Sequence, residues 1–202
     1  MRLIAICTGL VTPLVLKGGD GQARTTPSGI VKQAVSTLEK PLQIEVKPLG
    51  VVGDEQYDHT VHGGLDKAVY MMPCEHYPFW SEQRRLNGLS SELPWGMLGE
   101  NLVCEGLSEE NLLLGDELHI GDVILRVTQP REPCYKFAVR MGYSKAPKHM
   151  VQNGCSGWYL RVVKPGMIQA GSPIQKVSTG EGKTVLDQFR FLTRKGQLDL
   201  LD

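Results

Sequence analysis

The sequence predicts a mostly β protein, a closed β-barrel with a few short helices and a C-terminal helix. Its 202 residues include 23 Gly and 12 Pro, a mixture typical of short strands joined by turns. Turn signals recur in the second half, at residues 115–116, 121–122, 153–154 and 165–166. Between them, residues 123–129 alternate with a period of two, as a strand with one buried face does. We therefore expect a mostly antiparallel sheet that closes into a barrel.

The first half is expected to contain strands separated by polar loops. Apolar runs predict strands at residues 2–8, 29–35, 43–51 and 68–72. A Gly-rich loop up to Pro27 follows the first strand, and the polar loop 53–67 precedes the last one. Pro73 ends that last strand, and a short helix is expected from there to about Leu86.

The end of the chain has a helical pattern. Thr184 with Asp187 resembles a capping box, and apolar residues then recur at helical spacing to about Lys195. The apolar stripe is expected to pack against the barrel or against a second subunit, which leaves a homodimer open. We therefore divide the chain into a barrel domain, residues 1–180, and a C-terminal helical tail, residues 181–202.

Composition excludes several classes of partner. Lys and Arg total 22, as do Asp and Glu, so no net charge draws the protein to nucleic acid or to an anionic membrane. No segment approaches the ~20 apolar residues of a membrane helix, and no cleavage site follows the first apolar stretch. Five cysteines without a CxxC pair argue against a disulfide framework and a thiolate zinc site, so a cytoplasmic location is expected.

Cys134 is the first candidate for chemistry. Pro130 and Pro133 stiffen the chain around it, and Arg131 and Lys136 place positive charge beside it. Nearby cations favour the thiolate, which attacks electrophiles and binds soft metals. The alternative is a small buried hydrophobe, the usual state of a free cysteine and the one we expect for the other four.

A second candidate is the end of the polar loop. Gly63 and Gly64 allow backbone amides to approach a ligand, and Lys67 adds a positive charge, a combination suited to a phosphate or another oxyanion. The alternative is a simple turn or bulge. His59 and His62 lie in the same loop without the HExxH spacing, so a zinc site is not expected.

The third candidate is Gly99-Glu100-Asn101. Its side-chain amide and carboxylate are suited to a polar heterocycle, although an Asn after a Gly is equally suited to closing a turn. No Walker A motif, no GxGxxG motif and no serine nucleophile elbow is present.

Taken together, the three segments resemble the MOSC domain, the family named for the molybdenum cofactor sulfurase C-terminus. They are Gly53 to Val69 with its Gly63-Gly64 pair, then Gly99 to Asn101, then Pro130 to Lys136. Within the family, the chain is most similar to the stand-alone YiiM-like branch, which is linked to detoxifying N-hydroxylated purines. The resemblance runs from near the N-terminus to about Val177.

The resemblance implies a β-barrel with the molybdenum cofactor, molybdopterin with its phosphate, in a cleft. Cys134 matches the family cysteine and would be the protein's ligand to molybdenum. The implied cofactor-binding residues are Lys17, Arg24, His62, Gly63, Gly64, Lys67, Asn101, Arg131 and Lys136. YiiM-like proteins commonly carry a longer helical extension after the barrel, whereas this chain has room for about one helix.

The function implied by this resemblance is reduction of N-hydroxylated compounds, such as hydroxylamino bases, to amines. The chain has no flavin or nicotinamide motif, so an external reductase is expected to donate the electrons. The alternative is a carrier in which Cys134 holds sulfur as a persulfide, or holds the cofactor for delivery, without turnover. A third alternative is a barrel with a degenerate pocket, which would act only by associating with other molecules.

Overall fold

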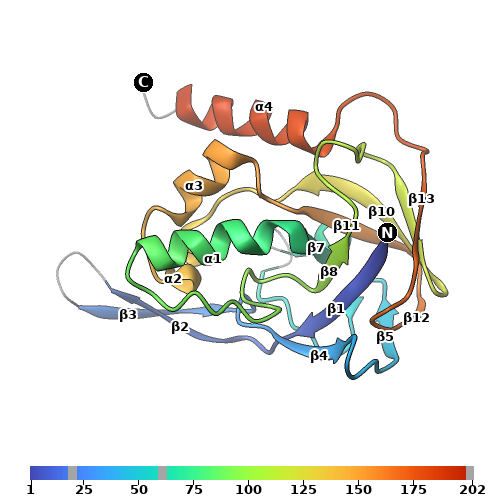
Figure 1. Ribbon diagram of the computed structural model, residues 1–202, viewed down its shortest axis with the longest axis horizontal. Helices are drawn as coiled ribbons and strands as arrows, with labels where there is room; N and C mark the ends of the chain where they lie inside the picture. The colour runs from blue at the N-terminus through green and yellow to red at the C-terminus, as the bar shows by residue number, and fades with distance from the viewer. Residues whose placement is uncertain (18–21, 59–62, 199–202) are drawn as a thin grey trace.

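A computed structural model describes residues 1–17, 22–58 and 63–198, with the backbone alone for residue 17 and residues 195–198. In this part of the chain, one large curled sheet lies beside a group of three helices, and a fourth helix runs across the top (Figure 1). The mostly β prediction is confirmed.

The large sheet has eight strands in the order β13-β9-β10-β11-β7-β8-β1-β4. Their bounds are β1 (Arg2–Thr8), β4 (Gln33–Thr37), β7 (Val69–Pro73), β8 (Leu102–Glu105), β9 (Glu117–Ile120), β10 (Val123–Pro130), β11 (Trp158–Lys164) and β13 (Ile174–Val177). All neighbours are antiparallel except β7 and β8. The strands predicted at 2–8, 68–72 and 123–129 are therefore confirmed, because their apolar faces are buried in this sheet.

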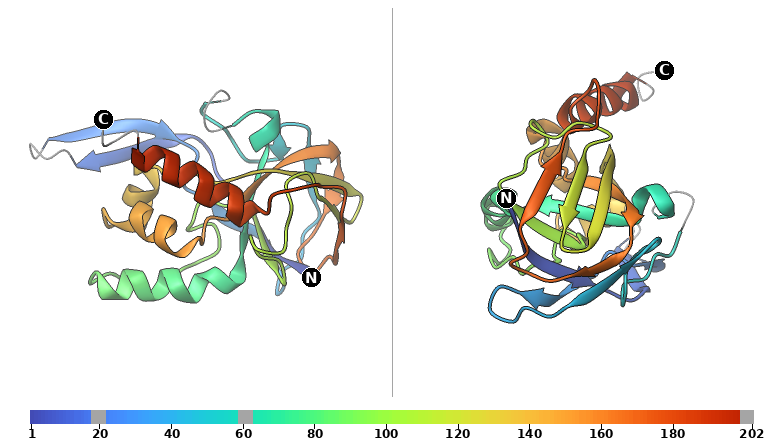
Figure 2. Two further views of the ribbon diagram at one scale, coloured as in Figure 1. Left: turned by 90° about the horizontal axis from the view of Figure 1, so that it is seen from above. Right: turned by 90° about the vertical axis from the view of Figure 1, so that its right-hand side faces the viewer.

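Closure of the barrel is not confirmed, since the sheet has two edge strands, β4 and β13. The reason is that one edge of β1 is divided between two partners, β4 and the turn before β13. From Ala5 onward it pairs with β4, whereas Leu3 N–H donates to Ser172 O (2.9 Å) and Leu3 O accepts from Gly171 N–H (2.7 Å). The sheet thus curls until the turn before β13 reaches the start of β1, without a continuous ladder (Figure 2).

Two smaller sheets accompany the large one. The strands β2 (Thr12–Lys17) and β3 (Ala23–Ser28) form a hairpin, and β12 (Gly166–Ile168), β5 (Ile44–Lys47) and β6 (Gly50–Val51) form a three-stranded sheet. The Gly-rich loop predicted up to Pro27 is therefore wrong. The hairpin extends away from the large sheet in Figure 1 and its side chains are mostly exposed, so it lacks the buried face that a sequence pattern reveals.

The helices are α1 (Tyr77–Leu86), α2 (Tyr135–Met141), α3 (Ala146–Asn153) and α4 (Val185–Leu198), with 3-10 turns η1 (Leu65–Lys67) and η2 (Cys74–His76). The predicted helix to Leu86 and the C-terminal helix are confirmed. The N–H of Asp187 donates to Thr184 Oγ1 (3.0 Å), which is the expected cap. The few short helices of the predicted fold class include α2 and α3, but no residue pattern located these two, which are too short to show a clear helical period.

Two apolar clusters form the core. One fills the inside of the curled sheet and includes Met71 and Trp158; the other lies between sheet and helices and includes Trp80 and Phe137. Phe189 of α4 is fully buried in the second cluster. Burial of this one side chain contributes about 2–3 kcal/mol of hydrophobic stabilisation. The tail thus packs on the sheet domain, while the boundary at residue 180 stays a prediction.

Candidate cofactor site

The three sequence motifs meet in one cleft, with an empty volume of about 760 Å³ that is partly open to solvent. Five predicted site residues line it: Lys67, Asn101, Arg131, Cys134 and Lys136. They come from η1, the residue before β8, the connection between β10 and α2, and the first turn of α2, and residues around Ser28 and Asp54 complete the wall. Segments far apart in the sequence therefore converge as the resemblance implied.

Cys134 lies where β10 gives way to α2. Pro130 is the last residue of β10 and still pairs with Trp158, and Tyr135 begins α2. Between them the backbone of Cys134 is extended, with φ −142° and ψ 158°, and its carbonyl accepts a hydrogen bond from Phe137 N–H (3.1 Å). The thiol is half-buried and belongs to the cleft wall, so it is held in place and remains accessible to a ligand.

Arg131 places a fixed positive charge at this wall. Its side chain is buried, and Nη1 donates to Leu98 O (2.9 Å) and to Tyr70 Oη (3.3 Å), while the guanidinium lies 4.4 Å from the ring centroid of Phe137. Burial lowers the pKa of Arg131, but the interactions of the guanidinium with Tyr70, Cys134 and Tyr159 outweigh burial, and the pKa lies above its ordinary value. The group therefore stays charged beside the thiol.

Two lysines extend the positive wall. Lys136 Nζ donates to Pro27 O (3.2 Å) and lies 5.6 Å from the ring centroid of Tyr57. Lys67 Nζ lies 5.7 Å from the ring centroid of Tyr159. Cationic nitrogens paired with aromatic faces suit an anionic ligand that also has a flat ring system.

Asn101 has a structural position in the cleft. Its Nδ2 donates to Asp54 Oδ2 (2.8 Å) and to Cys7 O (3.4 Å), and its Oδ1 accepts from Tyr70 N–H (3.1 Å). Both donor hydrogens are thus engaged within the protein. Asn101 links the wall strands β1, β7 and β8, and direct contact with a pterin stays a prediction.

The ion pair between Lys32 and Asp54 was not foreseen as part of the site. Lys32 Nζ contacts Asp54 Oδ1, which also accepts from Gly9 N–H (2.9 Å). Their side chains are 7% and 6% exposed, and both residues line the cleft. Asp54 stood at the edge of a recognised motif, whereas Lys32 lies 22 residues away in the sequence and offered no local signal.

The Gly63-Gly64 pair lies behind the wall and does not line the cleft. Gly64 N–H donates to Gln56 Oε1 (2.8 Å), and a Cβ on Gly63 would lie 2.3 Å from the same oxygen. Gln56, which does line the cleft, therefore occupies the place predicted for a phosphate beside these amides. Because the glycines have no side chains, Gln56 can approach their backbone closely, and its hydrogen bond to Gly64 fixes the start of the loop that leads to Lys67.

Three predicted residues remain, and two of them lie in the β2–β3 hairpin. Lys17 and Arg24 lie in the β2–β3 hairpin, where Lys17 pairs with Ala23 and Arg24 pairs with Leu16, and Arg24 does not line the cleft. Arg24 is exposed. His62 lies outside the described residues.

The donor set fits a cofactor that brings its own metal ligands. Within the described ranges, no three or more His, Cys, Asp or Glu side chains are grouped to hold a metal ion. One soft thiol beside cationic and aromatic side chains instead suits a metal already bound by an anionic organic ligand. In the same part of the chain, no helix combines the length and apolar character needed to cross a bilayer.

Comparisons with known proteins agree with this geometry. The MOSC domain model matches residues 58–175. The chain is 41% identical over 137 residues to the uncharacterized protein YflK of Bacillus subtilis (strain 168), covering 68% of this chain and 59% of that protein. It is 33% identical over 165 residues to protein YiiM of Escherichia coli (strain K12), covering 82% and 72%. The chain thus spans less than two thirds of YflK.

Two further likenesses extend the comparison. A protein of Gibberella moniliformis (strain M3125 / FGSC 7600) named "Reductase" is 40% identical over 127 residues, which cover 62% of this chain and 22% of that protein. The crystal structure of YiiM from Geobacillus stearothermophilus superposes with a TM-score of 0.70 at 29% identity, covering 96% of this chain and 84% of that one.

Proposed function

Because the chain belongs to the MOSC domain family, whose members bind molybdenum cofactor, we propose that its cleft holds this cofactor and that the protein reduces N-hydroxylated compounds to amines. Hydroxylamino bases are the proposed substrate class. The observation that carries the proposal is Cys134, an accessible thiol in a wall with Arg131, Lys67 and Lys136.

Each side chain has a role that follows from its contacts. The Cys134 sulfur is the proposed protein ligand to molybdenum, a soft donor for a soft site. Arg131 keeps a positive charge beside that sulfur, and Lys67 and Lys136 would bind the anionic part of the cofactor. Asn101 fixes the strands that carry these residues and has a positioning role.

The bound cofactor would supply the redox step that the side chains cannot perform. Reduction of a hydroxylamine to an amine takes two electrons and two protons and releases water. An external reductase is the proposed electron donor, and the similarity to a fungal protein named "Reductase" supports a redox role for the fold. Tyr57 and Tyr159 offer aromatic faces to a planar base at the cleft.

Molybdenum content tests the ligand assignment. Protein produced in a host that makes molybdopterin is expected to contain molybdenum, and Cys134→Ser is expected to lose most of it. Cys74→Ser is a matched control, since Cys74 is also partly exposed but lies outside the cleft. Equal molybdenum in wild type and Cys134→Ser would remove the assignment.

Turnover separates the reductase from a carrier. Loaded protein is expected to consume 6-hydroxylaminopurine in the presence of a chemical reductant and to form the amine, whereas protein without cofactor is expected to be inactive. Loaded protein that does not turn over, but transfers its cofactor or a persulfide sulfur, would replace the reductase with the carrier function.

A further inference from the structure

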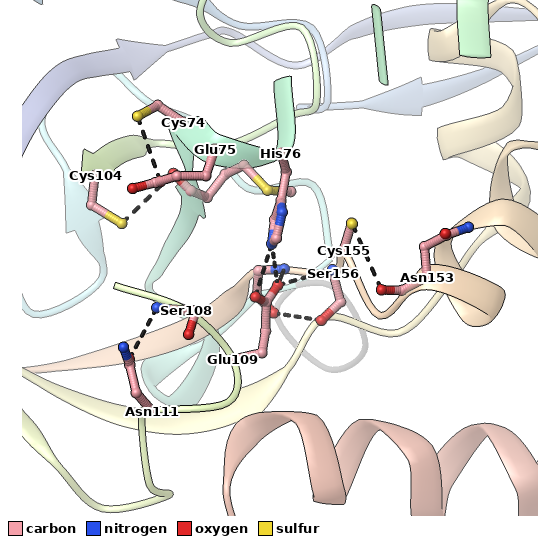
Figure 3. A network of polar contacts seen from close by, with 12 residues as sticks. Cys74, Glu75, His76, Cys104, Ser108, Glu109, Asn111, Asn153, Cys155 and Ser156 are labelled. Atoms are coloured by element: carbon pink, nitrogen blue, oxygen red, sulfur yellow. Dashed lines mark hydrogen bonds and ion pairs between the residues drawn. The ribbon is translucent and has the colours of Figure 1, made fainter. Parts of the chain in front are cut away.

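A second group of reactive side chains lies outside the cleft (Figure 3). His76 ends η2, Glu109 lies in the loop before β9, and Cys155 follows α3. Nε2 of His76 lies 2.8 Å from Oε2 and 3.0 Å from Oε1 of Glu109. Figure 3 shows the Cys155 sulfur beside the imidazole, with which it interacts, and the thiol also donates to Asn153 O (3.8 Å). We call these three residues the thiol cluster.

The carboxylate of Glu109 is held firmly in the thiol cluster. It is 3% exposed, and its Oε1 accepts hydrogen bonds from the N–H groups of Ser156 (3.1 Å) and Gly157 (2.7 Å). These two residues directly follow Cys155. The backbone that positions the sulfur therefore also positions the carboxylate that orients His76.

His76 carries a positive charge at neutral pH. Burial opposes that charge, but the hydrogen bonds of the imidazole with Cys155 and Glu109 and the charge of Glu109 raise the pKa of the imidazole to about 10. Because Nε2 faces Glu109, Nδ1 is the ring nitrogen left for the thiol. The thiolate is the form of a cysteine that attacks electrophiles, and a positive charge near the sulfur is the usual arrangement at reactive cysteines.

Two other uses of such a cluster are less well supported. Among the described residues, no three or more His, Cys, Asp or Glu side chains form a metal-binding group, so these three do not converge as zinc ligands do. Acyl transfer needs amide donors for an oxyanion, and the N–H groups of Ser156 and Gly157 are already bonded to Glu109. Oxidation of the sulfur needs neither a group of metal ligands nor free amide donors.

We propose that Cys155, paired with His76 and Glu109, is a site of oxidation by hydroperoxides, independent of the cofactor cleft. The thiolate attacks one peroxide oxygen, the O–O bond breaks, and the departing hydroxide or alkoxide takes the proton from His76. The sulfur is oxidised by two electrons to a sulfenic acid, and the peroxide is reduced to water or an alcohol. Cys155 is 9% exposed, which suits a small oxidant better than a bulky one.

The start of α4 covers the thiol cluster. The N–H of Leu186 donates to Glu109 O (2.9 Å), and a Cβ on Gly154 would lie 2.7 Å from Leu186 Cδ1. Little room is left beside Cys155, so an added oxygen is expected to press on the first turn of α4.

The chain contains its own control for the experiment. Cys74 is more exposed than Cys155, but burial and the neighbouring Glu75 raise the pKa of its thiol to about 11. Cys134→Ser protein, which removes the cleft thiol, is treated with hydrogen peroxide and dimedone, and peptide masses report the labelling rate of each cysteine. Labelling of Cys155 is expected to be at least about ten-fold faster than that of Cys74.

Variants of the partners test the mechanism. In the same background, His76→Asn and Glu109→Gln are each expected to slow labelling of Cys155 by about ten-fold, with the rate at Cys74 unchanged. Labelling of the buried Cys7 and Cys104 would reveal an unfolded variant. In that case the proposal is tested by the ratio of the labelling rates of Cys155 and Cys74 in the parent protein. Labelling of Cys74 as fast as Cys155, or a folded His76→Asn protein with an unchanged rate at Cys155, would overturn the proposal.

Discussion

Asn101 and Asp54 bond to each other across 47 residues of sequence, with Asn101 Nδ2 2.8 Å from Asp54 Oδ2. The other carboxylate oxygen of Asp54 contacts Lys32, and Asn101 bonds onward to Cys7 and Tyr70. This chain of polar contacts joins the strand β1 to β7 and β8 behind the cleft. Four predictions follow from it and from the contacts around the two thiol sites.

Asp54→Asn is expected to destabilise the protein by about 3 kcal/mol or more, because it leaves the buried Lys32 charge unpaired and turns an amide donor toward Asn101 Nδ2. Urea unfolding measures the change. Glu82→Gln is the matched control, since the Glu82–Arg85 pair is exposed, and a much smaller change is expected there. Equal effects at the two sites would contradict the structural role of Asp54.

Arg131→Lys is expected to lower both stability, by about 1–3 kcal/mol, and molybdenum content, although the charge is kept. Lysine cannot reproduce the guanidinium contacts with Leu98 O and the Phe137 ring. Urea unfolding and metal analysis provide the two readouts. Arg161→Lys, which changes an exposed pair with Asp66, should leave both values near wild type.

The stability contributed by His76 is expected to fall at alkaline pH. The pKa of His76 is raised from 6.5 to about 10 in the folded protein, so the folded state holds the proton more tightly than the unfolded state. The contribution is complete below pH 6.5 and is lost as pH rises to about 10. It is on the order of 1–3 kcal/mol. The difference in unfolding free energy between wild type and His76→Asn should therefore shrink over this range, and a constant difference would disprove the link.

Gly154→Ala is expected to destabilise the protein more than Gly88→Ala. Both glycines have positive φ, 71° and 72°, so both substitutions cost about 1 kcal/mol of backbone strain. A new Cβ meets nothing within 4 Å at Gly88, but at Gly154 it lies 2.7 Å from Leu186 Cδ1. Thermal unfolding should show the extra loss at Gly154, and faster proteolysis of α4 should accompany it.

Sequence periodicity predicted the buried elements well, for a physical reason. Strands β1, β7 and β10 bury apolar faces in the core, and α4 buries Phe189, so their patterns reflect packing. The β2–β3 hairpin was missed because its strands pair with each other and bury little. Closure of the barrel could not be derived either, since it depends on how one edge of β1 is shared.

The candidate site was only partly accessible from sequence. The family resemblance brought Cys134, Lys67 and Asn101 to one place, and the cleft agrees. It could not reveal that Gln56 fills the space beside Gly64, because side-chain positions depend on tertiary packing. The thiol cluster was likewise hidden, since its three members come from separate segments and match no motif.

The shared edge of β1 has a consequence for synthesis of the chain. Leu3 leaves the ribosome long before its hydrogen-bond partners, Gly171 and Ser172, have been synthesised. Contacts of such long sequence separation form slowly. Until then the apolar first strand stays incompletely paired, a state in which strand edges invite aggregation and chaperones are most useful.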